Sequence, residues 1–297
     1  MNLMKYKKIF FLISAFFLVP GLISLALFGL KPAIDFTGGS LMEIEFLEEE
    51  KLSTYQEESF KDSLREIFEI NTIQLTGENN LIIKGKEISN ENKDIVLETI
   101  SQQYGELELL RFESVGPLLG KELLKKTFTA ILLVSGVIIF YIWRQFNEIK
   151  YGISAVLAMF HDSLILIGIF SLLGYFKGVE VDLLFVTAVL TTLSFSIHDT
   201  VVVYNRIREL QKKHKHLSLT AIANAAVWKT LGRSINDSVT IILMLLSLVL
   251  LGGESIRYFS LALLIGAITG TYSSTFTAVP ILLVWEEIVD RRKNKEK

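Results

Sequence analysis

The stretch Ile9 to Leu30 reads IFFLISAFFLVPGLISLALFGL and carries no ionisable side chain. An α-helix that rises about 1.5 Å per residue needs about 20 apolar residues to cross the hydrocarbon core of a bilayer. Lys5, Lys7 and Lys8 precede the stretch, as in a secretory signal peptide, but the apolar run is too long for one and no small-residue cleavage site follows it. The sequence therefore predicts a retained membrane-spanning helix, with residues 1–30 forming a cytoplasmic N-terminus and the first span.

Five further apolar stretches follow, and they predict five more spans. They are Thr127 to Trp143, Tyr151 to Gly174, Leu183 to Tyr204, Ser238 to Leu251 and Tyr258 to Trp285. The 297 residues are 51% hydrophobic and 21% charged, which excludes an ordinary soluble domain. A net charge of −2 excludes a nucleic-acid-binding protein, which needs a basic face. We expect a polytopic α-helical membrane protein with six transmembrane helices, five of them in a bundle over residues 127–285.

The basic residues of the short loops predict the orientation of the spans, because lysine and arginine resist translocation. Nearly all of them fall on one side, which we take to be cytoplasmic, whereas the opposite short loops offer Lys177 and Arg257. Both termini are then cytoplasmic, residues 286–297 form a basic tail, and residues 31–126 lie outside. The cytoplasmic set is Lys5, Lys7, Lys8, Arg144, Lys150, Arg206, Arg208, Lys212, Lys213, Lys215, Arg291, Arg292, Lys293, Lys295 and Lys297.

Between Ser40 and Val115 the periodicity changes to that of a small soluble domain. The pattern predicts a βαββαβ order, the ferredoxin-like α+β arrangement, as one extracytoplasmic domain between the first two spans. The expected strands are Leu41 to Leu47, Thr72 to Thr76, Leu81 to Lys84 and Leu107 to Ser114, with a hairpin turn at residues 77–80. The expected helices are Thr54 to Phe68, capped by Ser53, and Glu91 to Tyr104, capped by Ser89 or Asn90, with buried faces of Leu64, Ile67, Phe68, Ile95, Val96 and Ile100.

Ionisable residues cluster inside the predicted spans, where each costs at least about 2 kcal/mol unless it has a partner, a water path or a function. The third span holds His161 and Asp162, and the fourth holds His198 and Asp199 in its inner half. The fifth begins near Arg233 on the same side of the membrane, so that Arg233 can approach Asp199. A carboxylate beside an arginine that can leave it is an element of a proton relay.

Simpler interpretations of these residues stay open. Arg233 and Asp237 stand four residues apart on one helix face and can neutralise each other. His161 is either the local partner of Asp162 or an interior histidine bonded to a backbone carbonyl. Asp199 has no basic residue three or four positions before it, so a functional role is favoured there.

Two further patterns concern packing. Gly266 and Gly270 form a G-x-x-x-G in the sixth span, which lets another helix approach closely, most commonly within the same chain. Residues 217–233 show apolar side chains at helical spacing, which predicts an amphipathic helix at the cytoplasmic interface. No nucleotide-binding loop, metal-ligand cluster or nucleophile with a base is present, so we expect no enzyme and no cofactor or metal.

The sequence resembles the SecF proteins, the smaller members of the SecD and SecF pair that assists bacterial protein export. The likeness rests on an ordered series of motifs that runs from the first span to the last. They are Asp35-Phe36-Thr37-Gly38-Gly39, Ser114-Val115-Gly116-Pro117 through Gly120, His161-Asp162, the run from Phe195 to Glu209 that contains His198-Asp199-Thr200, Thr230-Leu231-Gly232-Arg233-Ser234, and Gly266 through Gly270 to Ser274.

The resemblance implies half of a transporter of the RND superfamily in the bacterial inner membrane, paired with SecD about a pseudo-two-fold axis. It implies the Sec channel (SecYEG) and the translocating preprotein as partners, with YidC and YajC as further candidates besides membrane lipids. Proton or sodium flow would drive movements of the outer domains. Asp199 matches the carboxylate that carries the proton and Arg233 its arginine partner, with Asp162 and His198 as further relay candidates.

The sequence departs from the family pattern at His198, Asn205 and Asp237, which stand where asparagine, aspartate and a hydroxyl residue are usual. Asp237 can therefore compete with Asp199 for Arg233, and both pairings stay open. Two other functions also stay open: half of an RND-type exporter of small molecules or lipids, which would copurify with a periplasmic adaptor, and a membrane scaffold without transport activity.

Overall fold

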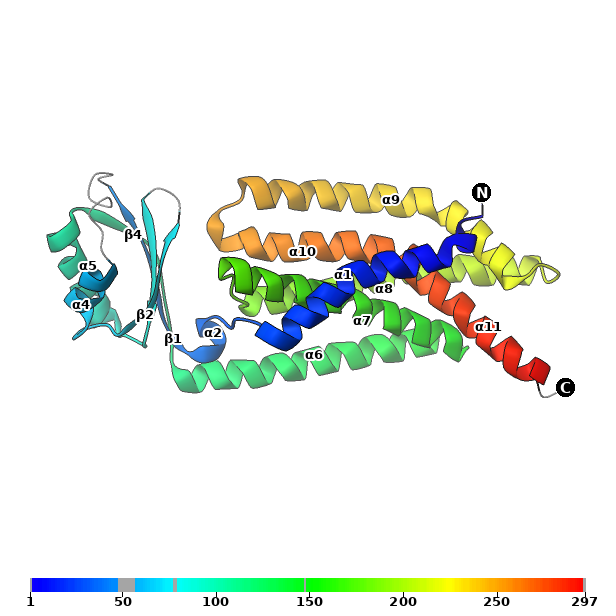
Figure 1. Cartoon of the computed structure of the whole chain (residues 1–297), viewed down its shortest axis with the longest axis horizontal. Coiled ribbons are helices and arrows are strands. Elements are labelled where there is room, and N and C mark those ends of the chain that lie inside the picture. Colours follow the sequence, from blue (N-terminus) through cyan, green and yellow to red (C-terminus); the bar gives the residue numbers. More distant parts are fainter. Residues whose placement is uncertain (1, 48–56, 77–78, 147, 296–297) are drawn as a thin grey trace. The chain divides into compact units, whose positions relative to one another are not determined.

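The computed structural model describes residues 2–47, 57–76, 79–146 and 148–295. The chain divides into two compact units (Figure 1). Residues 1–31 and 129–297 form the helical unit, and residues 32–128 form the sheet-containing unit. This division lies close to the predicted domain boundaries at residues 30/31 and 126/127.

Six helical segments of the described chain are long and apolar enough to cross a membrane, which confirms the predicted number of spans. The helical unit begins with a short 3-10 turn, η1 (Leu3–Tyr6). It continues with α1 (Lys7–Phe28), the later part of α6 (Pro117–Gln145), α7 (Ile149–Lys177), α8 (Leu183–Lys213), α9 (Leu219–Leu251), α10 (Glu254–Ser273), η2 (Ser274–Ala278) and α11 (Val279–Lys295). The helix that carries the second predicted span begins at Pro117, before the apolar stretch that starts at Thr127, and proline is well suited to the first position of a helix.

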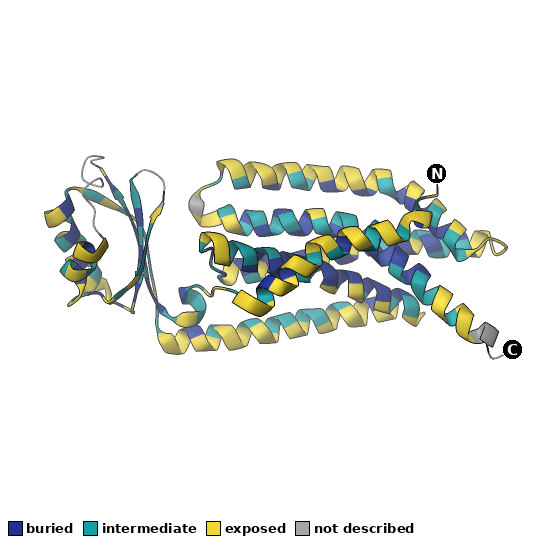
Figure 2. Cartoon of the chain, viewed as in Figure 1, coloured by how far each residue is buried: buried dark blue, intermediate teal, exposed yellow. Residues whose placement is uncertain are grey.

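The centre of the helical unit is formed by α7, α8 and the α10–α11 segment, whereas α1, α6 and α9 are largely exposed (Figure 2). Tyr151 and Tyr204 pack together in the largest apolar cluster, and their rings lie 5.3 Å apart. The hydroxyl of Tyr204 donates to the carbonyl of Ala278 and also lies 2.8 Å from Ser154 Oγ. One buried side chain therefore links α7, α8 and η2.

The predicted amphipathic helix at residues 217–233 is not a separate interfacial helix, because α9 runs unbroken from Leu219 to Leu251. Gly232 is the weakest helix former near the expected break, and a single glycine costs only about 1 kcal/mol inside a helix. The apolar face that suggested interfacial binding includes Ile222, Ala226 and Val227, which pack into the core of the bundle.

The sixth span is interrupted by the π-helical turn η2, which the sequence did not predict. Pro280 follows two residues after this turn and has no backbone N–H to donate to the carbonyl of Phe276. A widened turn is a usual response to such a missing bond, and π-helical turns are frequent at functional sites.

The other unit has the predicted βαββαβ order. Its elements are α2 (Ile34–Thr37), β1 (Gly39–Phe46), α4 (Glu57–Leu64), β2 (Ile70–Thr76), β3 (Asn80–Gly85), α5 (Asn90–Tyr104) and β4 (Leu107–Val115). The antiparallel sheet has the order β2-β3-β1-β4, so that β3 lies between β1 and β2 as in a ferredoxin-like fold. The register of β1 against β4 shifts between Glu43 and Ile44, where β4 carries an extra residue.

The core of this unit follows from the sequence pattern with two corrections. Met42, Ile44 and Phe46 alternate along β1 and are fully or almost fully buried against both helices. Ile95 is 48% exposed rather than buried, because Val96 and Ile100 occupy the inner face of α5. The first helix ends at Leu64, four residues before the predicted end at Phe68.

Of the predicted helix caps and hairpin turn of this unit, one cap is confirmed and the others lie wholly or partly outside the described residues. Ser89 caps α5, since its side chain accepts a hydrogen bond from the backbone of Asn92. Ser53, with the predicted start of the first helix, and the first half of the hairpin turn, Gly77 and Glu78, lie outside the described residues.

Candidate functional site

Asp199 lies on α8, beside the helix α9 that begins at Leu219. Ser234 Oγ donates to Asp199 Oδ2 at 2.6 Å. This is a charge-assisted bond when Asp199 is ionised, and it satisfies one of the two carboxylate oxygens without neutralising the charge. In the described part of the chain, Asp199 therefore has a hydroxyl partner and no basic one.

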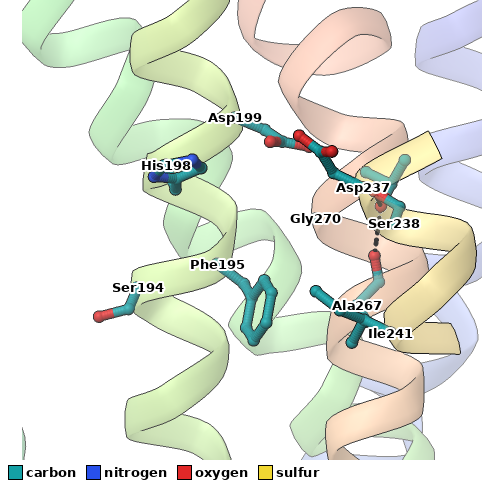
Figure 3. A pocket seen from close by; sticks show the side chains of 10 residues that line it. Ser194, Phe195, His198, Asp199, Asp237, Ser238, Ile241, Ala267 and Gly270 are labelled. Carbon is teal, nitrogen blue, oxygen red and sulfur yellow. Dashed lines mark hydrogen bonds between the residues drawn. The ribbon is translucent and has the colours of Figure 1, made fainter. Parts of the chain in front are cut away.

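The carboxylate of Asp199 borders a cavity of about 390 Å³ between α8, α9 and α10. The lining residues are Ser194, Phe195, His198 and Asp199 of α8, Asp237, Ser238 and Ile241 of α9, and Ala267, Gly270 and Thr271 of α10. Figure 3 shows the side chains of Asp199 and Asp237 pointing toward each other. A hydrogen bond of 2.7 Å from Thr271 to Ser238 joins α10 to α9 at the cavity. The cavity thus presents two carboxylates and several hydroxyls at the helix surfaces.

Arg233 does not pair with Asp199 in this structure. Its Nε lies 3.6 Å from Asp237 Oδ2, and both side chains are more than half exposed. The two residues stand four apart on α9, which is the local pairing that the sequence left open. Asp237 therefore lies between the cavity and the arginine. His198 also borders the cavity and is exposed.

His161 and Asp162 form a second polar group, which is buried on α7. His161 Nδ1 lies 2.9 Å from Asp162 Oδ1, so that His161 is the local partner of Asp162. The other carboxylate oxygen of Asp162 accepts a hydrogen bond from Ser273 of α10. Asp162 is 3% exposed, and both of its oxygens are satisfied.

The G-x-x-x-G of the sixth span packs within the chain. A Cβ atom on Gly266 would lie 1.9 Å from Cγ2 of Thr192, and one on Gly270 would lie 3.4 Å from Cα of Ser196. Both neighbours belong to α8. The two glycines therefore set the distance between α10 and the helix that carries Asp199.

The two glycine-containing motifs that flank the sheet-containing unit meet in space. Asp35 lies on α2, and Gly38 and Gly39 lead into β1, while Gly116 and Pro117 join β4 to α6. A Cβ atom on Gly38 would lie 2.8 Å from Cα of Pro117. The motifs therefore fix the junction where the chain enters and leaves the sheet.

Sequence reasoning missed two hydroxyl partners, Ser234 of Asp199 and Ser273 of Asp162. Ser273 lies in the small-residue run of the sixth span that suggested packing, and Ser234 ends the motif that begins at Thr230. A serine inside an apolar helix is also a donor for a neighbouring carboxylate. Among the residues that the structure describes, no group of three or more histidine, cysteine, aspartate or glutamate side chains is placed to hold a metal ion.

Comparison with known proteins gives consistent matches along the chain. The C-terminal family of the protein export membrane proteins SecD and SecF matches residues 96–288, and the SecD/SecF GG motif matches residues 23–46. The protein translocase subunit SecF of Thermobaculum terrenum is 40% identical over 297 residues, which cover 96% of this chain and 94% of that protein. The protein translocase subunit SecDF of Bacillus subtilis is 33% identical over 94% of this chain and 37% of its own length.

Among solved structures, the crystal structure of SecDF from Thermus thermophilus, described as a translocon-associated membrane protein, matches with a TM-score of 0.83 at 28% identity. The match covers 97% of this chain and 39% of the SecDF chain. The similarity includes the helical unit and the sheet-containing unit, and it agrees with the motif order in the sequence. The chain belongs to the SecD/SecF family of protein export membrane proteins.

Proposed function

We propose that the protein is an ion-driven auxiliary subunit of Sec-dependent protein export. It pairs with a SecD protein at the Sec channel of a bacterial inner membrane and acts on a translocating preprotein. Both termini are cytoplasmic and residues 31–126 lie outside, as the loop charges indicate. The family supports the role in export, and the fused SecDF of Bacillus subtilis supports pairing with SecD. The work is mechanical rather than enzymatic.

The observation that carries this proposal is the position of Asp199. An aspartate in a membrane span is costly unless it is paired or solvated. Asp199 has a serine as its only hydrogen-bond partner among the described residues and borders a cavity of about 390 Å³. A carboxylate in this setting can bind and release a proton or a sodium ion without first breaking an ion pair. Arg233, held by Asp237, would join Asp199 only at another stage of the cycle.

The test is Asp199→Asn in the complex with its SecD partner. We expect the variant to fold and to copurify with SecD, because asparagine keeps the shape and the hydrogen bond to Ser234. The late stage of export, which needs an ion gradient and no ATP, should fall at least about tenfold, since the amide cannot carry an ion. Asp290→Asn is the matched control, since Asp290 is exposed near the end of α11.

The measurement is translocation into membrane vesicles in which a proton or a sodium gradient is imposed separately. Normal late-stage export by the Asp199→Asn complex would refute the proposal. A response to only one of the two gradients would identify the coupling ion.

A further inference from the structure

One buried side-chain atom of the group His161–Asp162–Ser273 has no hydrogen-bond partner. Within the described part of the chain, His161 Nε2 and Ser196 Oγ are the two buried side-chain atoms without a hydrogen-bond partner. His161 and Ser196 are 9% and 1% exposed. Leaving a buried donor or acceptor unpaired costs about 1–3 kcal/mol, so such atoms are usually satisfied by a buried water molecule.

The two atoms without a partner lie on α7 and α8, and both helices contact the same stretch of α10. Ser196 on α8 packs against Gly270 of α10. Ser273, the partner of Asp162, lies one turn further along α10, and its hydroxyl is also 3.3 Å from the Gly270 carbonyl. One turn of α10 therefore contacts both Ser196 on α8 and the His161–Asp162 pair on α7. Asp199 follows Ser196 by three residues, on the next turn of α8.

We propose that His161, Asp162 and Ser273 form a second proton-binding site, connected to Asp199 by water held between His161 Nε2 and Ser196 Oγ. The inference rests on the proposed function, because it gives the proton of Asp199 a place to go. In this proposal, His161 Nε2 is the atom that accepts the proton, and Ser196 is the residue that positions the water.

The proton transfer balances in charge. At the start, Asp199 is protonated, and Asp162 is ionised beside a neutral His161 whose Nδ1–H points to it. The O–H bond of Asp199 breaks, an N–H bond forms at His161 Nε2, and the water passes the proton on. Afterwards Asp199 is ionised and the His161–Asp162 pair is neutral overall. One net negative charge moves between two sites, so the low-dielectric interior never has to hold two.

Few other titratable groups face this site. The titratable side chains that face it on α8 are Asp199 and its neighbour His198, and those on α9 are Arg233 and Asp237, which pair with each other. The α1 stretch from residue 9 to 30 and η2 carry none. On α10, the Tyr272 hydroxyl donates to the Phe10 carbonyl, and on α11, Glu286 and Glu287 pair with Lys150 and Lys7. Asp199 is therefore the exchange partner that the surroundings offer.

The experiment follows the imidazole nitrogens directly. The chain has four histidines, at positions 161, 198, 214 and 216. A complex with its SecD partner, labelled with ¹⁵N-histidine on this chain, therefore gives signals from four imidazole rings with two nitrogens each. His161→Gln identifies the signal of interest, and if that variant does not fold, replacing the other three identifies it by elimination. The spectra are recorded between about pH 5 and pH 9, where imidazole ordinarily titrates.

We expect His161 Nε2 to titrate in this range and Asp199→Asn to shift its midpoint by about one pH unit or more, as coupled sites do. Ser196→Ala should at least halve that shift, since it removes the hydroxyl that positions the water. Ser163→Ala is the matched control, because its hydroxyl is buried on α7 but bonded to the Met159 carbonyl. It should leave the shift unchanged.

Two results would overturn the proposal. If His161 keeps one protonation state across the range, the pair only packs the helices. If His161 titrates but neither Asp199→Asn nor Ser196→Ala changes the midpoint, the two sites are not connected. Either result leaves the proposed function intact when Asp199→Asn still blocks export, whereas normal export by Asp199→Asn refutes the proposed function whatever His161 does.

Discussion

At the scale of single residues, the two carboxylates inside the bundle have contrasting surroundings. Asp162 is closed in by His161 and Ser273, whereas Asp199 has one serine and an open cavity. A side chain that must exchange an ion needs a route to it, and a side chain that must hold a proton needs shielding. The two roles that we propose for these carboxylates are argued from their surroundings rather than from residue type.

Gly38 is a second residue whose surroundings determine its identity. Its φ of +75° with ψ of 165° lies in a region that only glycine enters readily, at a cost of about 1–3 kcal/mol for other residues. A Cβ atom there would also lie 2.8 Å from Cα of Pro117. We therefore predict that Gly38→Ala lowers the free energy of unfolding of the sheet-containing unit by about 2 kcal/mol or more.

Gly116→Ala is the control for that variant. Gly116 belongs to the motif that joins β4 to α6. A Cβ atom added there would meet only the end of the flexible Glu87 side chain, at 3.4 Å. The measurement is the urea midpoint for unfolding of the sheet-containing unit, followed by pulse proteolysis of the full chain in detergent. Equal midpoints for the two variants would contradict the role given to Pro117.

At the scale of elements, the contact of α10 with α8 positions the site. The β-branched side chain of Thr192 cannot move aside easily, because its Oγ1 is bonded to the Val189 carbonyl. Gly266→Ala would place a methyl group 1.9 Å from Thr192 Cγ2 and must push the helices apart. We predict that it destabilises the bundle by about 1–3 kcal/mol, as overpacking usually does.

The control is Gly136→Ala on α6, where an added Cβ meets nothing within 4 Å. This variant should be neutral or slightly stabilising, since alanine is the better helix former. Loss of helical circular dichroism during titration with sodium dodecyl sulfate compares the two. If Gly266→Ala matches Gly136→Ala, the close packing of α8 and α10 is not needed for stability.

The elements also show what sequence can predict. Six spans and the βαββαβ order follow from hydropathy and periodicity, which are local patterns, and both are confirmed. The Arg233–Asp237 contact is local as well, so it was among the sequence alternatives. The bonds of Ser234 to Asp199 and of Ser273 to Asp162 join residues 35 and 111 positions apart. They depend on which helix faces meet, and no periodicity encodes that.

At the scale of the whole molecule, the chain consists of two units with separate cores. The core of the sheet-containing unit is contributed by both helices and the sheet, and includes Phe46, Phe60, Leu64, Val96 and Tyr104. The core of the helical unit is centred on Tyr151 and Tyr204. A domain that moves under an ion gradient must stay folded while the helices rearrange, so independent stability is a requirement of the proposed function.

We therefore predict that a fragment of residues 33–116 folds alone and unfolds cooperatively in urea. A domain of about 84 residues should have a free energy of unfolding of about 4–12 kcal/mol. Phe60→Ala, at a fully buried position, should remove about 3–5 kcal/mol of it, whereas Leu110→Ala, at a 44% exposed position, should remove less than about 1 kcal/mol. Far-UV circular dichroism and tyrosine fluorescence, to which buried Tyr104 contributes, should report coincident transitions. Separate transitions, or equal effects of the two substitutions, would mean that the sheet needs the membrane helices to hold its core, and a rigid moving domain would then be excluded.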